Sequence, residues 1–301
     1  MNLTYDEFKI TLASQVTNLV GDEVNVTIHK VQKNNGILLD AISIMRTGVY
    51  TAPSIYLEAL YEHYERGKSI LEIAKKVISL SEEGQLKGVL PKDFFMDYNK
   101  IKGRICYRVV NYEKNQQFLK TVPHKKVLDL AMIYYYSVEP ELLKNASVLI
   151  RNIDLQRWGI EADEIKARAE VNTPCVNPWQ LITMAELLEQ IIEDRNLRVR
   201  FELPEDDPIN MYIITNQDKY FGASCIFYPQ VLEEIAERIN NQFYILPSSV
   251  HECIIMPAQK GFSQESLSRM VTEINESQLD EVEVLSDQAY FYNRDKKELI
   301  L

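Results

Sequence analysis

The residues that could do chemistry are most concentrated in the stretch Leu246–Pro257, which reads LPSSVHECIIMP. A serine or cysteine nucleophile needs a histidine within about 3 Å to accept its proton, and a third group to orient that histidine. Ser249 and Cys253 flank His251 at a spacing of two residues. Glu252 follows the histidine directly and is a candidate for the supporting role. The stretch therefore contains the side chains that a hydrolase would use.

The backbone expected for this stretch argues against that chemistry. The apolar residues predict a β-strand over His251–Met256, in which successive side chains point to opposite faces. The imidazole of His251 and the carboxylate of Glu252 would then diverge. Neighbours on one face of a strand have Cα atoms about 6.5 Å apart, so Ser249 or Cys253 would have to lean toward the ring. We favour a turn at Pro247–Ser249 leading into a buried strand, and keep nucleophilic catalysis as the alternative.

A second candidate is Asp129, which lies between two leucines in a run expected to be a strand covered on both faces. A carboxylate there must find a cation or several hydrogen-bond donors, because an isolated charge costs several kcal/mol. His124, Lys125 or a distant arginine could be the partner. A structural ion pair is favoured over a functional site, since structural networks perturb carboxylates as well.

No metal or cofactor site is predicted. The four histidines are far apart in sequence, and the chain lacks the helical His-x-x-x-His pair and the glycine-rich loops that hold nucleotides. Gly222–Ser224 offers small side chains that could admit a ligand or another backbone, although a bulge or tight packing is the commoner cause. The four cysteines form no Cys-x-x-Cys pair and are expected to be buried thiols: Cys106, Cys175, Cys225 and Cys253.

Charge restricts the kind of partner. The net charge of −11 disfavours direct binding to nucleic acid, because that affinity comes from lysine and arginine. Glu202–Asp207 and Glu273–Glu283 are the densest acidic stretches and are expected to be solvated loops and helix ends. Tyrosine clusters at Tyr134–Tyr136 and Tyr290–Tyr292 would suit a protein interface, although alternate members of a strand more often face the core.

The location of the protein is predicted from what the sequence lacks. No apolar run approaches the roughly 20 residues that cross a bilayer. The first residues, MNLTYDE, do not resemble a signal peptide. We therefore expect a cytoplasmic protein without a membrane segment.

Local signals predict the elements of the first part of the chain. Thr4 and Glu7 have the spacing of a capping box at the start of a helix. Asn34–Gly36 predicts a hairpin turn between two apolar strands, because asparagine and glycine tolerate positive φ. A helical region is expected from Pro53, interrupted at Gly67.

Periodicity predicts the rest. We expect helices over Tyr98–Tyr112, Ala162–Val171 and Leu267–Asn275. Two further helices are expected to begin at a cap at Asn177 and at Pro229. The expected strands are Lys126–Val138, Ala146–Ile153, Met211–Thr215, Phe221–Tyr228, Phe243–Leu246, His251–Met256, Ala289–Tyr292 and Leu299–Leu301. Strands and helices are mixed without strict alternation, which indicates an α+β fold with mostly antiparallel sheets and packed helices. We expect a helix, hairpin and helix region over residues 1–90 and a larger α+β region over 91–301, or one continuous domain. A boundary near residue 205 is the other candidate.

Together these stretches give the chain a family resemblance. It resembles an uncharacterised bacterial (Firmicutes) family that is known only as a domain of unknown function. The resemblance covers most of the chain, and the matching stretches are Val122–His124, Leu128–Ala131, Thr215–Asn216, Gly222–Ala223, Leu246–Ser249, His251–Glu252, Val284–Asp287 and Tyr290. It implies bacterial origin and cytoplasmic residence, and it transfers no catalytic role.

Three functions follow as hypotheses. The leading one is a non-enzymatic protein-interaction or regulatory protein that presents an acidic, tyrosine-bearing surface to a protein partner. The second is a hydrolase that uses Ser249 or Cys253 with His251, supported by Glu252 or Asp129. The third is an acidic inhibitor that occupies the basic channel of a nucleic-acid-binding protein. The oligomeric state, the ligand and the pathway are not indicated by the sequence.

Overall fold

The computed structural model of the chain describes residues 3–21, 23–46, 52–84, 97–138, 147–187, 211–259 and 261–301. These residues form two compact units, Met1–Asp97 with Ser137–Ser147, and Tyr98–Tyr136 with Val148–Leu301. The boundaries expected near residues 90 and 205 lie outside the described residues. Both units combine helices with antiparallel strand pairs, so the α+β class is confirmed. None of the helices in the described segments combines the length and apolar character that crossing a bilayer requires.

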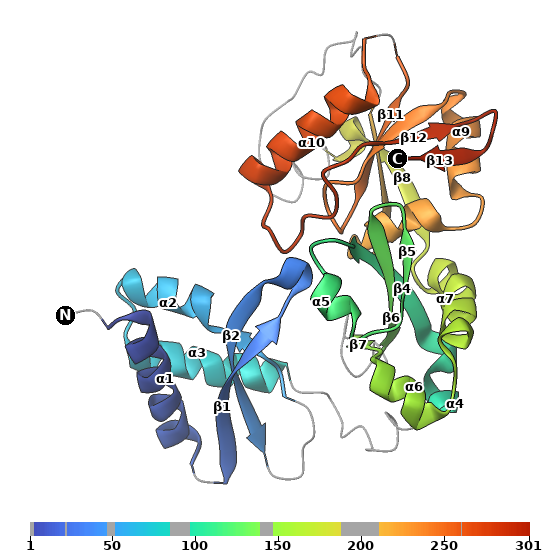
Figure 1. Cartoon of the computed structure of the whole chain (residues 1–301). Coiled ribbons are helices and arrows are strands. Elements are labelled where there is room, and N and C mark those ends of the chain that lie inside the picture. Colours follow the sequence, from blue (N-terminus) through green and yellow to red (C-terminus); the bar gives the residue numbers. More distant parts are fainter. Residues whose placement is uncertain are drawn as a thin grey trace. The chain divides into compact units, whose positions relative to one another are not determined.

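The first unit is a three-stranded sheet with helices packed on it (Figure 1). Its elements are α1 (Tyr5–Val20), β1 (Val24–Gln32), η1 (Asn34–Gly36), β2 (Leu38–Arg46), β3 (Ile55–Tyr56), α2 (Leu57–Glu65) and α3 (Ile70–Glu83). The predicted capping box is present, because Glu7 and Thr4 exchange hydrogen bonds at the start of α1. The predicted turn is present too, with φ of 59° at Asn35 and 75° at Gly36. The core is formed by the inner faces of the three helices and of β2.

The second unit contains two sheets. Its elements are α4 (Tyr98–Ile101), η3 (Lys102–Arg104), β4 (Ile105–Asn111), α5 (Gln116–Leu119), β5 (His124–Val127), β6 (Leu130–Ser137), β7 (Ser147–Leu149), α6 (Asn152–Trp158), α7 (Ala162–Val176), β8 (Trp179–Thr183), β9 (Tyr212–Asn216), η4 (Gly222–Phe227), α9 (Val231–Ile239), β10 (Phe243–Leu246), β11 (Cys253–Pro257), α10 (Gln264–Gln278), β12 (Tyr290–Asn293) and β13 (Glu298–Ile300). The smaller sheet has the order β4-β6-β5, with β7 also paired to β6. The larger sheet has the order β13-β12-β10-β11-β9-β8 (Figure 1).

Several predicted elements of this unit are confirmed. Helices lie where the patterns around Ala162 and Leu267 and after Pro229 predict them, as α7, α10 and α9. Strands β9, β10, β12 and β13 also match, and β7 covers part of the stretch predicted to pair beside β6. These segments carry a clear apolar period together with a nearby turn or cap.

Other predictions for this unit are wrong. The helix expected over Tyr98–Tyr112 is a single turn followed by β4, whose residues are almost all buried and so carry no period. The strand expected over Lys126–Val138 is a hairpin, β5 and β6, that turns at Leu128 with a φ of 52°. Asn177 ends α7 instead of capping a new helix, and the next element is strand β8. The predicted strand from Phe221 is the 3-10 helix η4.

The free edge of β4 joins the smaller sheet to α7 and η4. Along this edge the backbone N–H of Tyr107 donates to Oγ1 of Thr173 at 3.0 Å, and that of Val109 donates to Oγ of Ser224 at 3.2 Å. Buried backbone N–H groups need such partners, because leaving one unpaired costs about as much as a lost hydrogen bond. Side-chain hydroxyls therefore replace a further strand here, and they hold η4 beside β4.

Candidate functional site

His251 and Glu252 lie in the loop between β10 and β11, not in a strand. The strand β11 begins at Cys253, and Ser249 forms only an isolated bridge with Val284. The predicted strand is therefore present as β11, but it begins at Cys253 and not at His251. Pleating does not separate the imidazole from the neighbouring carboxylate, and their side-chain contacts decide what each can do.

The imidazole of His251 has a hydrogen bond at Nδ1 and a longer contact with a carboxylate at Nε2. Nδ1 accepts the backbone N–H of Phe221 at 3.2 Å, and Nε2 lies 3.7 Å from Oε1 of Glu283. Because Nδ1 is an acceptor, the neutral ring carries its proton on Nε2, where it faces the carboxylate. The ring also stacks on Phe221, with centroids 5.5 Å apart. His251 thus fastens its own loop to the loop before η4.

The nucleophile candidates are not aimed at this ring. Oγ of Ser249 accepts the backbone N–H of His251 at 3.0 Å, and the residue is only 3% exposed. Cys253 is fully buried, and burial raises the pKa of its thiol well above the usual value. A thiol reacts as its thiolate, so this cysteine is a poor nucleophile. The prediction that the hydroxyl of Ser249 forms a hydrogen bond with nearby backbone is confirmed.

Two carboxyl groups flank His251. Burial is the main cause that raises the pKa of Glu252 above its usual value, and the charge of Glu283 adds to it. The charge of His251 and a contact with the Ser249 hydroxyl act in the opposite direction. Glu252 and His251 therefore interact electrostatically, but the imidazole hydrogen bond goes to Phe221.

Gly222 is the point where three segments meet. A Cβ atom on this residue would lie 2.2 Å from Oγ1 of Thr215, and 2.6 Å from both the backbone nitrogen of Asn216 and the carbonyl oxygen of His251. The hydroxyl of Thr215 also donates to that carbonyl at 2.8 Å. Of the explanations open for the small residues at Gly222–Ser224, close packing of backbone on backbone is the one present.

Arg108, for which the sequence predicted no role, contacts the same loop. Its guanidinium carbon is 4.3 Å from the ring centre of Phe221 and 5.7 Å from that of Tyr135. The ring of Phe221 therefore contacts Arg108 as well as His251. Burial lowers the pKa of Arg108. The available signal was one charged residue in the apolar run ICYRVV.

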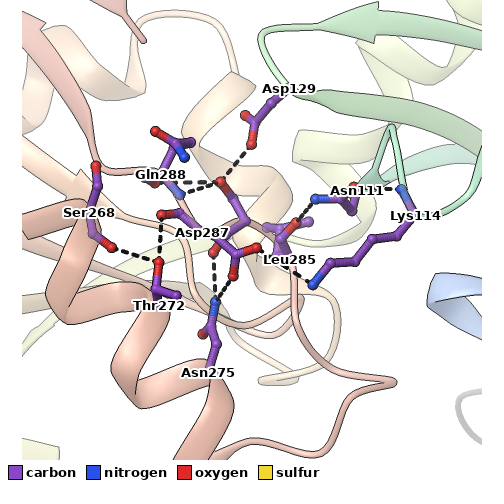
Figure 2. A network of polar contacts seen from close by, with 10 residues as sticks. Asn111, Lys114, Asp129, Ser268, Thr272, Asn275, Leu285, Asp287 and Gln288 are labelled. Carbon is purple, nitrogen blue, oxygen red and sulfur yellow. Dashed lines mark hydrogen bonds and ion pairs between the residues drawn. The ribbon is translucent and has the colours of Figure 1, made fainter. Parts of the chain in front are cut away.

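Asp129 is tied to the C-terminal segment (Figure 2). The residue lies in the turn between β5 and β6, and its carboxylate accepts the hydroxyl of Ser286 at 2.6 Å and that of Tyr290 at 2.5 Å. The requirement for several donors is confirmed, but the partners expected from sequence are wrong. His124 contacts the carbonyl of Val122. The ammonium of Lys125 instead lies 3.8 Å from a carboxylate oxygen of Glu170.

The same segment is held on its other side by β4 and α10. Asn111 donates to the carbonyl of Leu285 at 2.9 Å, and Asn275 donates to the carbonyl of Ser286 at 2.9 Å and to Oδ1 of Asp287 at 2.7 Å. Figure 2 shows these contacts and that of Asp129 converging on one stretch of chain, from β4, from α10 and from the turn between β5 and β6. Ser286 is fully buried, so these hydrogen bonds stabilise the packing of the segment, and we call the network the clasp.

A family comparison now places this geometry in context. One family model matches residues 5–294 of the chain. The chain belongs to DUF5688, a family of unknown function. The resemblance to a domain of unknown function is thereby confirmed, and its bacterial origin stays an expectation. No curated protein and no solved structure gave a significant match.

The remaining candidates of this DUF5688 chain are the tyrosines of β6 and the cysteines. Tyr134 and Tyr136 are buried and Tyr135 is less so, as alternation in a strand predicts. The cysteine prediction is confirmed except at Cys175, which is exposed. Among the described residues, no cluster of histidine, cysteine and acidic side chains could hold a metal ion.

Proposed function

We propose that this DUF5688 chain is a non-enzymatic protein that acts by binding a protein partner. The observation that carries the proposal is that Nδ1 of His251, the nitrogen with the lone pair, already accepts the backbone N–H of Phe221. A general base needs a nitrogen within hydrogen-bonding reach of the proton that it removes. The cluster that looked catalytic therefore supports a structural role.

The face that suits a partner is the C-terminal half of α10 and the turn after it. Residues 270–293 contain no lysine, arginine or histidine. Glu273, Glu276 and Asp280 are exposed there, as the sequence predicted for this acidic stretch. Met270 and Ile274 of the same helix are 44% and 36% exposed. Acidic groups around apolar ones favour a partner with a basic surface, because complementary charge raises the rate and specificity of association.

Charge reversal on α10 tests this proposal. Tagged wild-type protein and the double variant Glu273→Lys/Glu276→Lys are used to capture partners, and Glu237→Lys on α9 is the matched control. We expect the double variant to lose the partner, the control to keep it, and added salt to weaken the wild-type complex. A complex whose affinity changes neither with added salt nor with charge reversal would contradict the proposal, as would a failure to find any partner.

The hydrolase alternative is tested on the same protein. Wild type, His251→Ala, Ser249→Ala and Cys253→Ala are assayed against ester and peptide substrates, and their fold is checked by circular dichroism. We expect no turnover by the wild type and a lower melting temperature for His251→Ala. Turnover that disappears in a folded His251→Ala or Ser249→Ala variant would replace the proposal. If the captured partner is a nucleic-acid-binding protein that releases its nucleic acid when it binds this chain, the acidic-inhibitor hypothesis would replace the proposal.

A further inference from the structure

Arg108 is a cation for which the described residues supply no anion. Its Nε atom is buried and has no hydrogen-bond partner among those residues. The groups that contact the guanidinium are the rings of Phe221 and Tyr135, which are uncharged. An arginine buried in this way normally pairs with a carboxylate or a phosphate.

The neighbouring rings do not satisfy the guanidinium. A ring face attracts the positive charge of Arg108, as Phe221 does at 4.3 Å. A guanidinium also has N–H donors in its plane, and a ring face offers them no oxygen acceptor. A buried donor without an acceptor destabilises the folded protein. The Nε–H of Arg108 therefore lacks the oxygen acceptor that it would bind.

The loop beside Arg108 is held in place. Asn216 donates to the carbonyl of Tyr220 at 2.8 Å and accepts its backbone N–H at 3.1 Å. Phe221 has a φ of 54°, which is strained for a phenylalanine, and His251 fixes its N–H. A rigid loop loses little conformational entropy when a ligand binds, and strained backbone of this kind occurs at binding sites.

The site can be reached from solvent. Arg108 as a whole is partly exposed although its Nε atom is buried. The side chain of Tyr220 is on the surface, with 47% exposure. Its ring lies 4.3 Å, centroid to centroid, from the ring of Phe221, which contacts Arg108.

We propose that Arg108, framed by Tyr135, Tyr220 and Phe221, binds the carboxylate or phosphate group of a small anionic ligand. A guanidinium recognises both groups because two of its N–H donors match two oxygen atoms. The net charge of −11 opposes a polyanion such as nucleic acid more strongly than a small anion. The site is separate from the face of α10, so it does not depend on the proposed protein partner.

Thermal unfolding of the full chain with added anions tests the site. Sodium phosphate and sodium acetate are titrated separately, with sodium chloride at the same ionic strength as reference. The variants are Arg108→Lys and Arg108→Met, with Arg269→Met as the control because Arg269 is exposed and pairs only with Glu265 among the described residues. Circular dichroism confirms that each variant is folded. Calorimetry gives the affinity for whichever anion raises the melting temperature.

We expect a saturable rise in melting temperature with phosphate or acetate beyond that with chloride, for wild type and Arg269→Met alike. Arg108→Lys should bind about tenfold more weakly, because lysine cannot make the paired contact, and Arg108→Met should not respond. A response to one anion and not the other identifies the ligand group.

Two results would overturn the site. If the anion raises the melting temperature of Arg108→Met as much as that of wild type, the effect is that of an adventitious ion only. If phosphate and acetate raise the melting temperature of wild type no more than chloride does, Arg108 is a packing residue. If Arg108→Met does not fold, Arg108→Lys and Tyr220→Ala decide the question, since Tyr220 is a surface side chain. Unchanged anion affinity in both of these variants would also overturn the proposal.

Discussion

The ring of His251 lies stacked on that of Phe221, with the planes 29° apart, and its Nδ1 accepts the Phe221 backbone N–H. Because the phenylalanine ring also contacts Arg108, one strained residue connects the β10–β11 loop to β4. The histidine that the sequence offers as a catalytic base is therefore part of the framework that positions an arginine.

Replacing Gly222 tests the close approach of the segments around it. We expect Gly222→Ala to destabilise the protein by about 3 kcal/mol or more, because the new methyl group would overlap backbone atoms that cannot move independently. Gly103→Ala is the control, since a Cβ there meets nothing within 4 Å. Urea unfolding measures both. A Gly222→Ala variant as stable as the control would show that these segments do not meet as described.

Removing one hydroxyl tests the clasp at Asp129. Tyr290→Phe leaves a carboxylate oxygen without its donor and should cost about 1.5–3 kcal/mol, the range for hydrogen bonds to charged groups. Tyr292→Phe in the same strand is the control, because its hydroxyl has no hydrogen bond among the described residues; we expect a change below about 0.5 kcal/mol. Chemical denaturation compares the two. Equal effects would mean that the carboxylate does not depend on Tyr290.

The features predicted correctly from sequence are those set by near neighbours in the chain. Thr4 and Glu7 form a cap within one helical turn, and Asn35 and Gly36 adopt the positive φ angles that their side chains allow. The partners of Asp129 could not be found in this way, because Ser286 and Tyr290 are 157 and 161 residues distant.

The candidate site was predicted only in part. Its residues were identified, but their roles depend on contacts of His251 with Phe221 and Glu283 that no spacing reveals. The expected strand at His251 failed because hydrogen bonds to Ser249 and Thr215 stabilise a loop there. Arg108 was overlooked because β4 was taken for a helix and the sequence analysis gave this arginine no role within it.

Glu252 predicts a pH dependence of stability. Its pKa is raised in the folded protein, mainly by burial, so the folded state holds this proton more tightly than the unfolded state does. The stabilisation is complete below the unfolded pKa near 4.5 and is lost as the pH rises through the folded pKa. The melting temperature of Glu252→Gln should therefore increase relative to that of wild type as the pH rises.

Glu7→Gln is a control for which the opposite pH dependence of stability is expected. Hydrogen bonds from the backbone and side chain of Thr4 lower the pKa of Glu7. The stabilisation that Glu7 gives is present above its unfolded pKa and is lost as the pH falls. The difference between Glu7→Gln and wild type should therefore shrink in acid. Calorimetric melting over a pH series measures both variants, and a Glu252→Gln difference that does not vary with pH would contradict the burial of that carboxyl group.

The protonation of the His251 ring tests most directly whether this residue is structural. Nitrogen-15 NMR of the labelled protein distinguishes the two ring nitrogens at a pH where the ring is neutral. We predict one fixed tautomer with the proton on Nε2 and with Nδ1 hydrogen-bonded to the Phe221 amide. A proton on Nδ1, or a ring that exchanges between both tautomers as a free imidazole does, would contradict the account and return His251 to the list of possible bases.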